Sequence, residues 1–119
     1  MNNLIASIVM LNMLEKHIKN DEKISEIEKA VITSINETGN VAKSCLLEAT
    51  EDNVIFSFSW DPSVTTETIP VMVYITVFKP SSSASTLGET MQKKLKEVLP
   101  GRKVFINFMP SSWLTEDLS

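Results

Sequence analysis

The chain has 119 residues, of which 11 are Lys or Arg and 15 are Asp or Glu, so its formal net charge is −4. Apolar residues make up 43% and charged residues 22%, which is typical of a globular protein and excludes a disordered one. The mild acidity argues against a nucleic-acid-binding protein, because such proteins need a basic surface to displace counterions from phosphates. We therefore predict no nucleic-acid partner. The length predicts a single domain over residues 1–119, with residues 110–119 as a C-terminal tail.

The chain holds one cysteine, Cys45, and one histidine, His17. An intramolecular disulfide or a common structural zinc site cannot be built from these two residues. We therefore predict no metal, no cofactor and a reducing compartment such as the cytoplasm. The apolar N-terminal stretch is too short to span a bilayer and lacks the basic start of a signal peptide. A cytoplasmic protein without a membrane partner is expected.

Apolar spacing predicts helices in the first third of the chain. Residues 3–19 are apolar at helical spacing on more than one face, which predicts a helix that is covered on more than one side. Asn20 and Asp21 are good N-cap residues for a second helix, and Gly39 is a natural end for it. One long helix with a bend near Asn20 is the alternative. The apolar stripe of the second helix comprises Ile24, Ile27, Val31 and Ile35.

The period then changes to that of strands. Residues 41–50 predict a first strand, and alternation over residues 54–60 predicts a second strand with an aromatic inner face. Residues 71–78 are apolar on both faces, which is typical of a central strand or of a strand at an oligomer interface.

A third helix is predicted to begin near Thr86, because Glu89 follows it at capping-box spacing, and a last strand is expected over residues 104–108. The element order is therefore α-α-β-β-β-α-β. The first three strands suit an antiparallel meander, whereas the crossover through the third helix makes the last strand parallel to the one before it. We predict an α+β fold, a two-layer sandwich of a mixed four-stranded sheet with helices mainly on one face.

The sequence shows no arrangement typical of catalysis. Cys45 lacks a Gly-rich elbow and His17 lies on the outer side of the first predicted helix, so no nucleophile–base pair is indicated. The chain starts with Met1-Asn2, and the nitrogen of the internal Pro70 is acylated, so no N-terminal proline base is expected. The glutamates of the second predicted helix alternate with lysines, as on a solvated face. We predict no catalytic residue and no enzymatic activity.

The chain carries more apolar surface than a lone domain of this size is expected to bury. This predicts a non-enzymatic protein-interaction module that forms a homo-oligomer, in the simplest case a homodimer, or that binds another protein. Two versions remain open: a small acidic binder or inhibitor of the immunity type, which neutralises a basic partner, and an adaptor or chaperone. The candidate interface residues are Leu4, Ile5, Ile8, Trp60, Met72, Tyr74 and Trp113.

The segment before the third predicted helix is rich in hydroxyl groups. Those hydroxyls, free backbone N–H groups and the helix dipole could hold an anion, although the segment lacks the glycines of a P-loop. The alternative function is therefore a small-molecule or anion-binding domain, which includes an enzymatic version. Its candidate residues are Ser81, Ser82, Ser83, Ser85 and Thr86.

Overall fold

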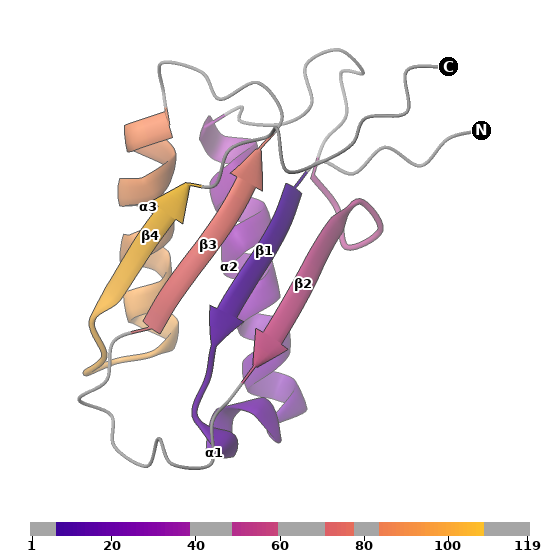
Figure 1. Ribbon diagram of the computed structural model, residues 1–119, viewed down its shortest axis with the longest axis vertical. Coiled ribbons are helices and arrows are strands. Elements are labelled where there is room, and N and C mark those ends of the chain that lie inside the picture. The colour runs from indigo at the N-terminus through magenta and orange to yellow at the C-terminus, as the bar shows by residue number, and fades with distance from the viewer. Residues whose placement is uncertain (1–6, 39–48, 60–70, 78–83, 109–119) are drawn as a thin grey trace.

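The computed structural model describes residues 7–38, 49–59, 71–77 and 84–108. Within these ranges the chain forms a four-stranded mixed sheet with both long helices on one side of it (Figure 1). The α+β class, the mixed four-stranded sheet and the placement of the helices are as predicted. The strands are β1 (Ser7–Asn12), β2 (Val54–Ser59), β3 (Val71–Val77) and β4 (Val104–Phe108), and the helices are α1 (Glu15–Ile18), α2 (Asp21–Thr38) and α3 (Ala84–Val98).

The segment predicted as a first helix over residues 3–19 contains a strand, so this prediction is wrong. It forms β1, and only the short α1 follows before α2. Val9 and Leu11 are buried on the helix side of the sheet, while Ile8 and Met10 lie on the other side and are half-buried. A strand that is apolar on both faces gives a continuous apolar run, which periodicity alone does not distinguish from a buried helix.

The pairing of the strands corrects one prediction and confirms two. The antiparallel meander is wrong, because β1 pairs with β2 in parallel and with β3 in antiparallel fashion. β3 is central in the strand order β2-β1-β3-β4, and β4 runs parallel to β3, both as predicted. Of the strand expected over residues 41–50, residues 41–48 lie outside the described part, and Ala49 and Thr50 precede β2 without strand pairing.

The sheet is built from two equivalent β-α-β units. β1, α2 and β2 form the first unit, and β3, α3 and β4 form the second. The antiparallel register pairs Met10 with Tyr74, so a local two-fold axis through this pair exchanges the units. No internal repeat is visible in the sequence. Equivalent positions include Val54 and Val104, which are both buried, and Ile55 and Phe105, which are both exposed.

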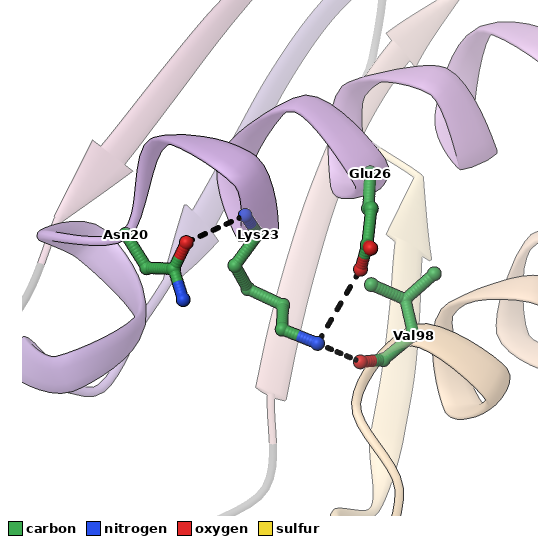
Figure 2. A network of polar contacts seen from close by, with 4 residues as sticks. All are labelled: Asn20, Lys23, Glu26 and Val98. Atoms are coloured by element: carbon green, nitrogen blue, oxygen red, sulfur yellow. Dashed lines mark hydrogen bonds and ion pairs between the residues drawn. The ribbon is translucent and has the colours of Figure 1, made fainter.

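Local contacts fix the two helices against each other. Asn20 is the N-cap of α2 as predicted, because its Oδ1 accepts a hydrogen bond from the Lys23 backbone N–H at 3.0 Å. The Lys23 Nζ donates to the Val98 carbonyl at 2.8 Å and lies 3.4 Å from a Glu26 carboxylate oxygen (Figure 2). The start of α2 is thereby joined to the end of α3.

The core lies between these helices and one face of the sheet. Its fully buried side chains come mainly from the two central strands and both long helices. Burial of this apolar surface is the main favourable term in folding. The largest members are Leu11, Met13, Ile27, Ile35, Ile75, Leu87, Met91, Leu95 and Leu99.

Candidate functional site

The opposite face of the sheet is not covered by any helix of the described part (Figure 1). The registers place its side chains in three rows that cross the strands. We call these three rows the uncovered face. The first row comprises Thr76, Ile8 and Ile55, and the second comprises Asn107, Tyr74, Met10 and Ser57. The third row comprises Phe105 and Met72, together with Asn12 and Ser59. In the last row the Asn12 Oδ1 accepts a hydrogen bond from the Met72 backbone N–H at 2.6 Å.

The uncovered face is largely apolar, and two of its exposed apolar residues, Ile55 and Phe105, lie on the outer strands. Ile55, Tyr74 and Phe105 expose 46%, 38% and 47% of their surface. The polar Asn107 and Ser57 lie on the two outer strands of the described sheet. Exposed apolar residues gathered in one place mark protein–protein interaction surfaces.

Three of the predicted interface residues lie together on the uncovered face: Ile8, Met72 and Tyr74. Their role in binding stays a prediction. The other four, Leu4, Ile5, Trp60 and Trp113, lie outside the described residues. The sequence-based prediction missed Met10, Ile55 and Phe105. The alternation within each outer strand could have found the last two, because Ile55 and Phe105 point away from the neighbours that face the helices.

The two outer strands of the described sheet, β2 and β4, have open edges of an unusual kind. Their sequences, VIFSFS and VFINF, contain no charged residue and no proline. Natural edge strands are blunted by lysines, prolines or bulges that stop another strand from pairing with them. On β2 the Phe56 and Phe58 rings are stacked, with centroids 5.8 Å apart. Both edges are therefore suited to pairing with a further strand.

The predicted anion loop lies only partly within the described residues. Ser81, Ser82 and Ser83 lie outside them, whereas Ser85 and Thr86 are exposed in the first turn of α3. That turn has no acidic side chain, and it lies at the end of the sheet where β3 ends and β1 begins (Figure 1). The helix dipole and free N–H groups of such a turn favour an anion. Anion binding at this turn stays a prediction.

Two charged side chains have environments that the sequence does not predict. Arg102, two residues before β4, is only 4% exposed, and the preceding Gly101 has a φ of 84°. Burial and, to a smaller extent, the charge of Glu51 raise the pKa of Glu28 above its ordinary value of 4.5. The two carboxylates repel each other, so this pair disfavours the folded state when both are charged.

The residues considered for nucleophilic catalysis are not brought together in the described part of the chain. His17 is half-buried in α1, and Cys45 lies outside the described residues. In the described ranges there is no group of three or more His, Cys, Asp or Glu side chains that could hold a metal ion. The helices in those ranges are all too short or too polar to cross a membrane.

Comparison with known proteins finds similarity in structure alone. No family model matches the sequence, and no curated protein matches it. A fused 4-OT, solved as a wild-type asymmetric trimer, has a TM-score of 0.65 at 10% identity over 94% of each chain. Malonate semialdehyde decarboxylase has a TM-score of 0.58 at 9% identity over 94% of this chain and 92% of its own. A member of the cis-3-chloroacrylic acid dehalogenase family has a TM-score of 0.56 at 12% identity, covering 92% and 79%.

The chain shares its fold with these solved structures. This finding contradicts the prediction of a non-enzymatic interaction module, because the solved structures of this fold include enzymes. The two versions of that module, the immunity-type inhibitor and the adaptor or chaperone, are therefore wrong as well. The alternative, a small-molecule domain with an enzymatic version, has the better support. The expected self-association is consistent with the trimer of the fused 4-OT.

The malonate semialdehyde decarboxylase structures include a variant in which the first residue, a proline, is replaced by alanine. In this chain Ala6 directly precedes β1, and a proline, Pro70, directly precedes β3.

Proposed function

We propose that this protein is an enzyme that acts on a small carboxylate and that works as a homo-oligomer. The observation that carries this proposal is the pairing of two β-α-β units in one sheet with helices on one face only. Malonate semialdehyde decarboxylase and the member of the cis-3-chloroacrylic acid dehalogenase family share this arrangement over most of their length. Both names specify a small molecule that bears a carboxylate.

The first turn of α3 is the part of the described structure that best suits such a carboxylate. Its backbone N–H groups carry the positive end of the helix dipole, and the exposed Ser85 and Thr86 add hydroxyl donors. The equivalent turn of α2 contains Asp21 and Glu22, which would repel an anion. Because Ala6 directly precedes β1, the proton-transfer group of the proposed enzyme is not a proline at that position.

The uncovered face supports the oligomeric part of the proposal. Tyr74 and Phe105 leave large apolar areas open in the lone chain, and burial between copies would remove these areas from water. A neighbour of the same fold is a trimer. We therefore expect the uncovered face to lie between copies of the chain.

The test of activity uses the full chain with malonate semialdehyde and cis-3-chloroacrylate, followed by proton NMR. We expect turnover of at least one of these compounds. Thr86→Asp should raise its KM about tenfold, because a new negative charge would face the carboxylate. Ser25→Asp, on the exposed surface of α2, is the matched control and should leave KM unchanged.

Two results would overturn parts of this proposal. If no small carboxylate is turned over and none raises the thermal unfolding midpoint, the chain is not an enzyme of this substrate class. If light scattering after size-exclusion chromatography shows a monomer at all concentrations, the homo-oligomer is wrong.

A further inference from the structure

We infer that Met10 and Met72 are sites of reversible oxidation by a peroxide, and that their oxidation weakens the contact between copies of the chain. This regulation rests on the proposed homo-oligomer and acts on the uncovered face. Both methionines lie on that face, and both are half-buried in the lone chain. The modified atoms are their two thioether sulfurs.

The four methionines of the described residues form two pairs with different surroundings. Met13 and Met91 are fully buried in the core, whereas Met10 and Met72 are half-buried outside it. A peroxide has to meet a sulfur atom to react with it. It therefore reaches the second pair in a folded chain and leaves the core pair intact, so the fold survives the modification.

Each methionine of the uncovered face has an exposed aromatic residue as its register neighbour. Met10 is opposite Tyr74 on β3, and Met72 is opposite Phe105 on β4. Neighbouring strands lie about 4.8 Å apart, which is close to the separation at which a thioether sulfur and an aromatic ring attract each other. Tyr74 and Phe105 are exposed, so both pairs lie in the apolar area that association would remove from water.

The two methionines are also close to each other. Met10 is opposite Tyr74, and Met72 precedes Tyr74 by two residues on the same face of β3. Such diagonal neighbours have Cα atoms about 7–8 Å apart. β1 and β3 are the two inner strands of the sheet, so the two oxidised groups would lie together on the inner strands of the uncovered face.

The reaction is an oxygen transfer with hydrogen peroxide as the co-reactant. The sulfur lone pair attacks one peroxide oxygen, the O–O bond breaks and an S–O bond forms. The proton on the transferred oxygen passes to the departing hydroxide, which leaves as water. The sulfur is oxidised and the peroxide is reduced. The flexible apolar thioether becomes a polar sulfoxide, and methionine sulfoxide reductases, one for each sulfoxide epimer, reverse the step.

The sulfoxides favour separated copies. In a separated copy water hydrogen-bonds to the sulfoxide oxygen, whereas a second copy packed on the uncovered face removes that water, which costs free energy. Packed copies shield both sulfurs, so oxidation takes place in separated copies and holds them apart. The reaction thus needs access to the lone chain only, where Met10 and Met72 are half-buried.

Peroxide treatment of the full chain tests this inference. The protein carries Cys45→Ser, which removes its one thiol, and it is treated at a concentration below Kd. Sedimentation equilibrium gives Kd before and after treatment, and peptide mass spectrometry locates the added oxygen. We expect Kd to rise at least tenfold, with oxygen on Met10 and Met72 before any on Met13 or Met91.

The matched control replaces both methionines by leucine, which has a similar volume and is not oxidised. Met10→Leu with Met72→Leu should associate about as tightly as the original chain, and peroxide should change its Kd by less than about twofold. Met1 and Met109 are present in both proteins, so their oxidation affects both alike. Treatment of the oxidised original chain with both sulfoxide reductases should restore its Kd.

Several results would overturn the inference and leave the homo-oligomer intact. One is an oligomeric chain whose Kd stays unchanged although Met10 and Met72 carry oxygen. Another is a leucine variant that dissociates after peroxide as strongly as the original chain. A third is oxidation of Met13 and Met91 at the same pace as the other pair, since dissociation would then follow from opening of the core. A chain that is monomeric before treatment overturns both.

A glutamine variant gives an answer without peroxide, even if the leucine variant does not fold. Met10→Gln with Met72→Gln places a polar amide where each sulfoxide would be. This variant should fold, because both positions lie outside the core, and its Kd should be at least about tenfold above that of the original chain. A folded glutamine variant with the original Kd would overturn the inference.

Discussion

Replacement of Phe105 by alanine separates association from folding. Phe105 is 47% exposed on the uncovered face. A phenylalanine side chain can bury about 150–250 Å², so about 90 Å² remains open in the lone chain. Covering that area at about 25 cal/mol per Å² is worth about 2 kcal/mol. Phe105→Ala should therefore weaken each junction between copies about thirtyfold in Kd.

The free energy of unfolding of the monomer should change less. A fully buried phenylalanine costs about 3–5 kcal/mol when it is truncated to alanine, but about half of Phe105 already contacts water. We expect a loss of about 1–2 kcal/mol, measured by urea unfolding at a concentration below Kd. Ile106→Ala is the matched control, because Ile106 is half-buried on the helix side of the same strand. It should lower the free energy of unfolding and leave the Kd of the folded protein unchanged.

The opposite pattern would refute this reasoning. If Phe105→Ala left Kd unchanged and lowered the free energy of unfolding by more than about 3 kcal/mol, Phe105 would be behaving as a fully buried core residue. The chain itself would then cover the uncovered face, and the homo-oligomer would lose its main support.

Three further changes test local features of the fold. Glu28→Gln removes a charge that burial and, to a smaller extent, Glu51 disfavour, so the variant should unfold at higher urea concentration at pH 7. Protonation of Glu28 removes the same cost, so the difference in urea midpoint should shrink as pH falls through the raised pKa and vanish below 4.5. Asn20→Ala should lower the free energy of unfolding by about 1 kcal/mol in thermal melts, while Asn20→Asp keeps the cap to Lys23. Gly101→Ala should cost about 1–2 kcal/mol, since alanine disfavours a φ of 84°.

The elements that the sequence predicts well are those with one apolar face and clear ends. α2 has a stripe with an N-cap at Asn20, and both features are local. β4 follows α3 by a short turn, so the right-handed crossover rule places it parallel to β3. The cap of α2 depends on residues that are near in sequence. The direction of β4 follows from a general rule of chain connection.

β1 is predicted wrongly because its two faces are apolar for different reasons. Val9 and Leu11 belong to the core, whereas Ile8 and Met10 belong to the uncovered face. The sum of the two patterns is a continuous apolar run that also fits a helix. Once β1 is taken as a helix, the first β-α-β unit disappears, and with it the repeated β-α-β order that relates this chain to its structural neighbours.

The site shows the same dependence on tertiary structure. The excess of apolar surface is visible in the sequence, and Ile8, Met72 and Tyr74 do lie together on one face. Their assignment to a non-enzymatic binder had no residue-level support beyond that excess. An oligomeric enzyme has the same need for apolar surface between copies, so hydrophobicity alone does not distinguish the two classes of protein.

The two β-α-β units are alike in backbone but differ in chemistry, and the differences indicate which end of the sheet would bind substrate. The first turn of α2 holds Asp21 and Glu22, whereas the equivalent turn of α3 holds no acidic residue. The two turns lie at opposite ends of the sheet (Figure 1). If both ends bound a carboxylate, neither turn should be acidic, because an acidic first turn neutralises the helix dipole that attracts the anion. A single carboxylate per copy, held at the α3 end, is therefore expected, and binding of two per copy in calorimetry would contradict this assignment.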